Sequence, residues 1–436
     1  MMLRRPTEFE LTVRLYADWQ ALLCALSLAA QKPQMTALLP VQQTPLLAPV
    51  ERFLRSGGVG LELEGTTLAL EVGASQPFIL EEPLTDYDAV GFMTALAATR
   101  KGSKLSIGVE IDNTLEMLIL ALRRMGAQLD FLPASPAIMI VEEPVQRAIK
   151  YQLRRESAKI TPHLLVAMAA LPGKSEISDL FALGRFDDIF KVFVPGFERI
   201  SLVESEPDDE LERRLRRQKQ VAVDYPSRIE ITGGLVTDAI QLDLQPDMEL
   251  AAYLSAGVAA GRQGRLRLQG LREEQIAETP LAQLHRMGVG FVAAAEGALQ
   301  CQPTELKARR VTYEQMHAYP DAIGALALAS ARLDSTTVIR TARFATPREE
   351  ARRHRLSELV KSLGVKIAEI KDGLVLEGRS DLMGDSISSD NDPVGQLMAL
   401  AACLGPVRQI ELDSVQAALD RWGASLQPVI DLLTSE

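Results

Sequence analysis

Six runs of small and apolar residues recur along the chain, and each has the length of a helix without a polar face. A helix that is apolar all round is buried on every side. The six runs are Trp19–Ala30, Val90–Ala98, His163–Leu171, Leu250–Ala259, Ile323–Ala331 and Val394–Leu404. A short break follows each run, and glycines stand in four of the breaks, which predicts that they cap the helices. These glycines are Gly102, Gly173, Gly264 and Gly405.

A strand pattern follows each break, and the six strands begin about 70 residues apart, with one longer interval of about 90. The next element is an amphipathic helix that ends at a glycine, as at Gly288 and Gly364. Alternating apolar residues then predict a hairpin, as in Ile367–Ile370 and Leu374–Leu376. The pattern therefore predicts six copies of a βαβαββ-type unit. Three units packed around their apolar helices, twice over, would give two lobes with helices inside and sheets outside.

The longer interval contains a highly charged segment, Glu204–Lys219, which is acidic at its start and basic at its end. This polarity suits the macrodipole of a helix, so the segment is interpreted as a solvated helical insertion. Two alternatives stay open for it. Its arginines could bind an anionic partner, or the helix could mediate assembly of a scaffold. The arginines are Arg213, Arg214, Arg216 and Arg217.

Composition narrows the classes of function. The chain has 436 residues, 47% of them hydrophobic, and a formal net charge of -11. Both nucleic acid and anionic lipid need a positive face, so we expect neither as a partner. No apolar run is long enough to cross a bilayer, and the N-terminal residues lack the pattern of a secretory signal. We therefore expect a cytoplasmic protein.

Cysteines and histidines show no ligand spacing in the sequence. Cys24, Cys301 and Cys403 lie in apolar or strand-like runs and are expected to be reduced core residues. The four histidines, His163, His285, His317 and His354, are far apart, so no metal site is expected. No phosphate-binding glycine loop is present either.

A family resemblance rests on the fifth unit. Tyr319-Pro320-Asp321-Ala322 is followed by an alanine-rich helix, by the strand Thr336–Arg340, and by Arg348-Glu349-Glu350-Ala351-Arg352. Order and spacing resemble the Pro-Asp pair, the Thr-Thr-Val-Arg strand and the Lys-Glu-Ser-Asp-Arg motif of the enolpyruvyl transferases, above all EPSP synthase. Weaker matches extend over nearly the whole chain. They are Ser157-Ala158-Lys159, Pro246-Asp247 and Asp392 before Met398.

The resemblance implies an α/β fold of two inside-out barrels. The N-terminal lobe would span 20–241, and the C-terminal lobe would combine 1–19 with 242–436. The strand over Phe9 to Leu15 would join the C-terminal lobe, and the second crossing would fall near Gln241 to Pro246. Such enzymes transfer the enolpyruvyl group of phosphoenolpyruvate to a phosphorylated, sugar-like substrate, without a cofactor, in a cleft between the lobes.

The resemblance also implies roles for individual residues. Asp321 would move a proton at the substrate hydroxyl, Glu349 would act at the enolpyruvyl methylene, and Arg352 would clamp the carboxylate of phosphoenolpyruvate. The plain alternative is that Asp321 caps its helix, while Glu349 and Arg352 pair on a helix surface.

The remaining candidates are binding residues. Arg348 keeps the charge of the motif lysine, and Asp247 matches by position. Ser157 and Lys159 would contact a phosphate, although Ser157 could equally cap the helix toward His163.

Several cations that the family uses are missing. Leu15 stands at the position of the first lysine, and Gln20 and Asn113 replace arginines. The Asp-His-Arg motif is Asp392-Pro393-Val394, and Glu249-Leu250 replaces a pair of serines. Unpaired buried anions are costly, so a cleft with fewer cations would bind two phosphorylated reactants poorly.

Two hypotheses follow for the function. The first is a non-catalytic family member that binds a small anionic ligand or a partner in the interlobe cleft. The second is an active carboxyvinyltransferase with an altered substrate. The oligomeric state is left open.

Overall fold

The computed structural model describes most of the chain. The residues outside it are 33–35, 133, 154–158, 180–183, 202–226, 237, 262–263, 278, 303, 312–318, 334, 341–346, 372, 379–381, 383, 385 and 436. The predicted insertion Glu204–Lys219 and the candidate Ser157 therefore lie outside the described residues. Arg348 and Glu349 lie in a described helix, but their side chains are not described.

The chain divides into two compact units that are discontinuous in sequence. Unit 1 comprises Met1–Trp19, Pro40–Leu47 and Leu244–Glu436. Unit 2 comprises Gln20–Leu39 and Ala48–Asp243. Each unit is described by itself below.

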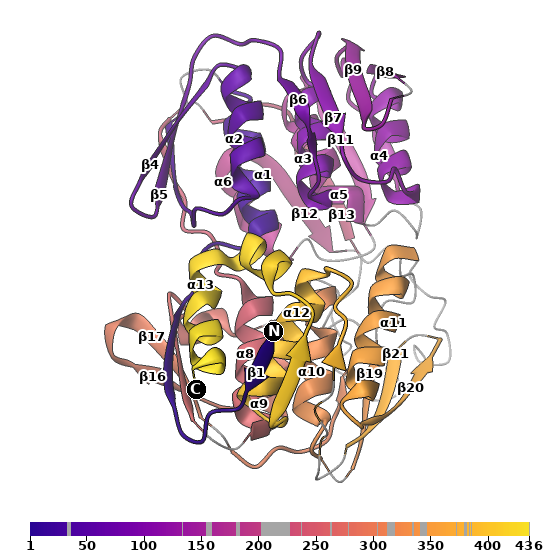
Figure 1. The fold of residues 1–436 in the computed structure, drawn as a ribbon. Coiled ribbons are helices and arrows are strands. Elements are labelled where there is room, and N and C mark those ends of the chain that lie inside the picture. Colours follow the sequence, from indigo (N-terminus) through magenta and orange to yellow (C-terminus); the bar gives the residue numbers. More distant parts are fainter. Residues whose placement is uncertain are drawn as a thin grey trace, which may run out of the picture. The chain divides into compact units, whose positions relative to one another are not determined.

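Three inner helices form the centre of each unit, and all six apolar runs found in the sequence are helical (Figure 1). In unit 2 they are α1 (Trp19–Ala29), α3 (Tyr87–Ala97) and α5 (Thr161–Ala169). In unit 1 they are α8 (Met248–Gly261), α10 (Ile323–Ser330) and α12 (Pro393–Leu404). Every residue of α8 and α10 is buried, which explains why their sequences show no polar stripe.

The predicted glycine caps are only partly correct. Gly405 is the C-cap of α12, but Ala98 and Ala170 are the C-caps of α3 and α5. Gly102 and Gly173 lie a few residues later, at positive φ angles of 80° and 96°. Glycine is needed at those two positions by the turn into the next strand rather than by the helix end.

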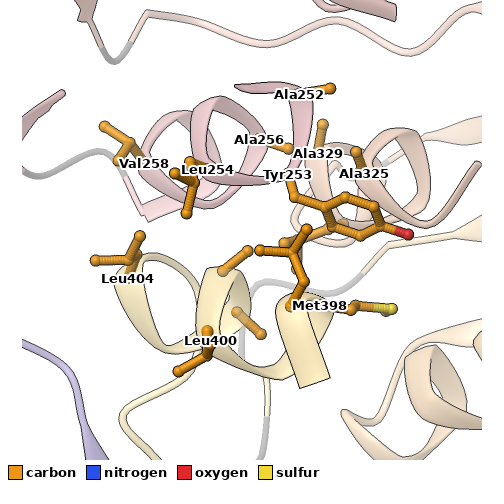
Figure 2. Packing of buried hydrophobic residues seen from close by; sticks show 14 of the residues in the cluster. Ala252, Tyr253, Leu254, Ala256, Val258, Ala325, Ala329, Met398, Leu400 and Leu404 are labelled. Atoms are coloured by element: carbon orange, nitrogen blue, oxygen red, sulfur yellow. The ribbon is translucent and has the colours of Figure 1, made fainter. Parts of the chain in front are cut away.

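Small residues let the inner helices of unit 1 approach closely. A Cβ atom on Gly257 of α8 would lie 2.2 Å from the carbonyl oxygen of Ala401 in α12. A Cβ atom on Gly324 of α10 would lie equally close to the hydroxyl of Tyr253. Figure 2 shows Tyr253 lying beside Ala325 and Ala329 of α10 and Met398 of α12. These helices therefore need alanine and glycine at the positions where their backbones come into contact.

Six sheets are present among the described residues, and at one edge of each sheet two strands run parallel. In unit 2 the strand orders are β14-β3-β5-β4, β6-β7-β9-β8 and β10-β11-β13-β12. In unit 1 they are β2-β15-β17-β16, β18-β19-β21-β20 and β22-β23-β1. The common order reflects a common local sequence pattern of strand, helix and hairpin.

The strands have the following bounds. In unit 2 they are β3 (Thr36–Pro40), β4 (Val59–Glu64), β5 (Thr67–Val72), β6 (Ile79–Leu84), β7 (Lys104–Ile107), β8 (Gln128–Leu132), β9 (Ala137–Glu143), β10 (Lys150–Gln152), β11 (Lys174–Asp179), β12 (Gly196–Ser201), β13 (Ser227–Thr232) and β14 (Ile240–Gln241). In unit 1 they are β1 (Met2–Arg4), β2 (Glu10–Arg14), β15 (Arg265–Gln269), β16 (Gly290–Ala294), β17 (Ala298–Gln302), β18 (Arg310–Val311), β19 (Thr336–Arg340), β20 (Lys366–Ile370), β21 (Gly373–Glu377), β22 (Ser386–Ile387) and β23 (Gln409–Leu412).

A second set of helices includes five that each precede a hairpin and the last helix of the chain, α13. It consists of α2 (Leu47–Ser56), α4 (Asn113–Arg124), α6 (Asp187–Phe193), α9 (Pro280–Arg286), α11 (Pro347–Ser362) and α13 (Gln416–Thr434). Helix α4 illustrates how they form. Asp112 accepts hydrogen bonds from the N–H groups of Thr114 and Leu115, each at 3.0 Å, and caps the helix. Leu118 and Leu122 then face the core, while Arg124 ends the exposed face.

The first residues of the chain complete unit 1. β2, which is the strand predicted over Phe9 to Leu15, pairs in parallel with β15. β1 pairs in antiparallel fashion with β23. The last sheet of unit 1 thereby receives its third strand from the other end of the sequence.

Two smaller expectations concern the cysteines and the length of the apolar helices. Cys24, Cys301 and Cys403 are buried and free, as predicted. Within the described ranges, the helices all fall short of the length and apolar character that spanning a bilayer requires.

Candidate functional site

The inner helices of unit 1 begin at an aspartate or directly after one. Asp247 is the residue before α8, Asp321 lies in the 3₁₀ turn η6 (Pro320–Ala322) before α10, and Asp392 is the N-cap of α12. At Asp247 and Asp392 the carboxylate accepts from one of the first N–H groups of its helix, which have no partner within the helix. Asp247 accepts from Leu250 N–H at 2.8 Å, and Asp392 accepts from Gly395 N–H at 3.2 Å.

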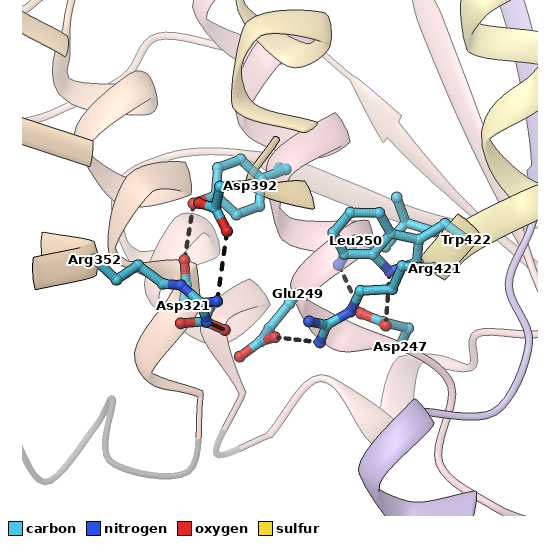
Figure 3. Close-up of polar contacts among 9 residues, drawn as sticks. Asp247, Glu249, Leu250, Asp321, Arg352, Asp392, Arg421 and Trp422 are labelled. Carbon is cyan, nitrogen blue, oxygen red and sulfur yellow. Dashed lines mark hydrogen bonds and ion pairs between the residues drawn. The ribbon is translucent and has the colours of Figure 1, made fainter. Parts of the chain in front are cut away.

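Arg352 joins two of these helix starts. Its Nη1 lies 2.5 Å from Oδ2 of Asp321, and its Nη2 lies 3.5 Å from Oδ1 of Asp392 (Figure 3). The three side chains are 17%, 13% and 5% exposed. An arginine that is largely removed from water needs compensating charge, and the two carboxylates supply it. The guanidinium of Arg352 is thus held by the protein itself.

Tyr253 connects α8 to the same ion pair. Its hydroxyl donates a hydrogen bond of 2.8 Å to the backbone oxygen of Asp321. Burial raises the pKa of Tyr253 well above its usual value, and the nearby carboxylates of Asp321, Glu249 and Asp392 raise it further. The phenol therefore stays protonated and acts as a fixed hydrogen-bond donor.

Helix α13 covers the start of α8 with an arginine and a tryptophan. The indole N–H of Trp422 donates to Oδ2 of Asp247 at 2.9 Å. Arg421 lies 3.7 Å from Glu249, and its guanidinium lies 5.0 Å from the centre of the Trp422 ring. Both oxygens of Asp247 are thereby engaged, one by the backbone of α8 and one by α13 (Figure 3).

The charge of this network is negative. Its carboxylates are Asp247, Glu249, Asp321 and Asp392, and its guanidinium groups are Arg352 and Arg421. Among the residues that the structure describes, four carboxylates of this network thus face two guanidinium groups. The positive ends of the helix dipoles favour carboxylates at these helix starts. Any further anion would meet these carboxylates at short range.

The predicted candidates fall into separate groups. Asp321 and Arg352 are in contact, and Asp247 belongs to the same end of the inner helices through α8. Glu349 and Arg348 lie three and four residues before Arg352 in α11, with side chains that are not described. Lys159 is exposed, just before α5, and belongs to unit 2.

The plain alternative for Asp321 does not match the geometry. The residue at the N-cap of α10 is Ala322, which has no side-chain acceptor, and the carboxylate of Asp321 receives Arg352 instead. Arg352 is largely buried, with 17% of its side chain exposed. The pairing of Glu349 with Arg352 and the capping role of Ser157 stay predictions, because the side chain of Glu349 and the whole of Ser157 lie outside the described residues.

Sequence reasoning missed three members of the network and undervalued a fourth. Tyr253, Arg421 and Trp422 carry no local signal that distinguishes them from ordinary helix residues. In the sequence, Glu249 stands out only as a position where the family has a serine. The signal that was available is the aspartate before each apolar helix, which could have grouped Asp392 with Asp247 and Asp321.

In unit 2, Asp86 and Asp112 cap two helices. Asp86 caps α3 by accepting from Ala89 N–H at 2.8 Å. The hydroxyl of Tyr87 donates to Asp112, the cap of α4. Together, Asp86 and Asp112 hold the starts of α3 and α4 in place.

The fold and the site define a class first: an inside-out α/β protein of the enolpyruvyl transferase type. The structure of EPSP synthase from Acinetobacter baumannii is similar with a TM-score of 0.68 at 17% identity, over 99% of this chain and 98% of that one. The enolpyruvyl transferase NikO from Streptomyces tendae gives a TM-score of 0.74 at 14% identity, over 100% of this chain and 97% of that one.

The family follows from sequence. The family model of EPSP synthase (3-phosphoshikimate 1-carboxyvinyltransferase) matches residues 196–419. The chain therefore belongs to the EPSP synthase family, as a divergent member.

Curated relatives confirm how far it has diverged. The 3-phosphoshikimate 1-carboxyvinyltransferase of Streptococcus sanguinis is 28% identical over 196 residues, 43% of this chain and 46% of that protein. The enzyme of the same name from Persephonella marina is 23% identical over 287 residues, 62% of this chain and 60% of that protein. The chain spans about half the length of the curated relatives it matches.

Proposed function

We propose that this chain is a family member that does not transfer an enolpyruvyl group from phosphoenolpyruvate to shikimate 3-phosphate, and that it binds a ligand or partner instead. The observation that carries the proposal is the position of Arg352 between Asp321 and Asp392. In the family this arginine would clamp the carboxylate of phosphoenolpyruvate, whereas here two carboxylates of the protein occupy it. A substrate would have to displace both.

The electrostatics of the helix starts support the same proposal. Both substrates of the family reaction are multiply charged anions, and an arginine fork or several cations would have to pair with each. The described network instead has two more carboxylates than guanidinium groups. Loss of several groups that stabilise charge lowers a rate by orders of magnitude. The predicted small anionic ligand and its interlobe position stay predictions.

The second candidate is enolpyruvyl transfer with an altered substrate. It is favoured by the contact between Asp321 and Arg352, because the resemblance gives these residues adjacent roles. Binding would then move Arg352 from Asp392 to the ligand carboxylate. The hydrogen bond between Arg352 and Asp392 that would break is already long, at 3.5 Å.

Phosphate release tests the two candidates. The full chain is incubated with shikimate 3-phosphate and phosphoenolpyruvate, with an active EPSP synthase as positive control. We expect no phosphate above the level of the Asp321→Ala variant. Turnover that disappears in that variant would show an active transferase and end the first proposal.

A binding assay covers an altered acceptor. Phosphoenolpyruvate alone is added in a thermal-shift titration of the wild type, of Arg352→Met, and of Lys361→Met as the control on the exposed face of α11. We expect no shift for any of them. A shift that Arg352→Met abolishes and Lys361→Met keeps would support the second candidate.

A further inference from the structure

A group of three side chains lies on the outer face of unit 1, between α11 and β20. His354 and Glu358 are four residues apart on α11 and share a helix face. Glu369 projects from β20, the strand that packs against this helix. One ligand atom from each side chain lies within 4.8 Å of the other two, and no other such group occurs among the described residues.

The contacts within the group are already close to those of a metal site. Nδ1 of His354 lies 2.7 Å from Oε1 of Glu369. Bonds from zinc to imidazole nitrogen and carboxylate oxygen are about 2.0–2.2 Å, so two such ligands on one ion lie roughly 3.3 Å apart. The side chains are exposed, so small rotations about their bonds would bring the ligand atoms from the observed separation to the one that an ion requires.

The donor set indicates the kind of ion. One imidazole nitrogen and two carboxylate oxygens suit a divalent transition ion, whereas calcium and magnesium prefer oxygen alone. Water would fill the remaining positions, because the group is open to solvent. We propose that His354, Glu358 and Glu369 form a surface binding site for a divalent transition metal ion of the Zn²⁺ type.

Neighbouring charge allows the ion to enter. Lys361 lies 3.3 Å from Glu358, in an exposed pair that contributes little to stability and is readily exchanged for a metal ion. The ion would tie α11 to β20 at a residue two positions after Arg352, and so would fix the helix that presents this arginine. The proposal does not depend on the proposed function.

Zinc titration of the full chain tests the site. The protein is first stripped with a chelator and then titrated with Zn²⁺ by calorimetry and in competition with a chromophoric chelator. We expect one ion per chain, binding at least about tenfold weaker in Glu358→Gln and in Glu369→Gln, and loss of the site in His354→Ala. Glu377→Gln is the matched control, since Glu377 is exposed in the same sheet and pairs with Lys366.

A spectroscopic measurement identifies the nitrogen ligand. Cu²⁺ bound to the wild type should show nitrogen hyperfine splitting in its electron paramagnetic resonance spectrum, and His354→Ala should lose it. Absence of one-to-one Zn²⁺ binding would leave His354 and Glu369 as an ion pair only and overturn the proposal. Equal binding by the wild type and by a variant that carries His354→Ala, Glu358→Gln and Glu369→Gln together would overturn it too. Unchanged circular dichroism of the variants shows that they are folded.

Discussion

At the scale of single residues, the site is defined by the compensation of buried charge. Arg352 and Arg421 are each matched by carboxylates that come from other helices. Removal of one partner from such a pair leaves a buried charge uncompensated. The resulting loss of folding free energy is larger than the net contribution of the intact pair. Two predictions follow from individual side chains.

The coupling between Asp321 and Arg352 can be measured by a double-mutant cycle. We expect Asp321→Asn, Arg352→Met and the double variant to give a coupling free energy of about 2 kcal/mol, because the contact is short and largely buried. Urea unfolding of unit 1 is the measurement. The exposed pair Lys366 and Glu377 of the same unit is the control, with an expected coupling below about 1 kcal/mol. Equal values for both pairs would contradict the role of burial.

His163 should make stability depend on pH. Burial lowers the pKa of His163 to about 4, against a smaller opposing effect of Asp88. The unfolded chain binds this proton near pH 6.5 and the folded chain only near 4, so the unfolded state holds more protons in between. Stability is therefore full above pH 6.5 and falls as the pH drops toward 4, by at most about 3 kcal/mol.

Urea unfolding between pH 4 and 7 checks this expectation. His163→Gln should flatten the dependence in this range. The control His354→Gln, in which an exposed ring is replaced, should keep it. A slope that is unchanged in His163→Gln would assign the effect to other groups.

At the scale of elements, the inner helices depend on backbone contact. Gly257 of α8 faces the carbonyl of Ala401 in α12, and Gly324 of α10 faces Tyr253 of α8. The contact of Gly324 lies at the start of α10, three residues after Asp321, whereas Gly257 and Ala401 meet toward the ends of their helices. Gly324 therefore positions the charged network as well as the core.

A methyl group at Gly257 should separate two of these helices. We expect Gly257→Ala to lower the unfolding free energy by about 1–3 kcal/mol, although alanine is the better helix former, because the added Cβ atom would lie 2.2 Å from a backbone oxygen. Gly60→Ala is the control, in an exposed strand position where the contact is 3.3 Å. A stabilised Gly257→Ala variant would show that the helices can shift freely.

At the scale of the whole molecule, the two units are built from discontinuous segments. β2 lies in the first residues of the chain but pairs with β15, and Ser425 of α13 donates to the backbone oxygen of Arg14 at 2.7 Å. Each unit has its own buried helices and sheets. Damage to one core should therefore stay within its unit.

Hydrogen exchange can separate the two units. Val13→Ala removes a fully buried side chain of β2 and should cost roughly 2 kcal/mol. Protection should fall in β15 and α13 and stay unchanged in β7 and β9. Val141→Ala in β9 is the reciprocal control, with losses confined to unit 2. Uniform loss across both units in either variant would contradict independent cores.

Part of the site could be found from sequence because its residues lie in local patterns. Asp321 stands beside Pro320 before an apolar helix, and Arg352 follows at a fixed distance within a charged helix. Glu249, Arg421 and Trp422 could not be found, because Trp422 and Asp247 are 175 positions apart in the sequence. His354 and Glu369 of the proposed metal site likewise come together only through the packing of α11 on β20, so their contact could not be found from sequence.

The sequence by itself determined the elements, which are six apolar helices that alternate with strands and hairpins. These features depend on hydrophobic periodicity and turn residues, which act over a few positions. The tertiary structure alone decided which carboxylates face Arg352 and Arg421 and which helices touch through glycine. Charge pairing and close packing depend on distances in space, and the chain sets those distances only when it is folded.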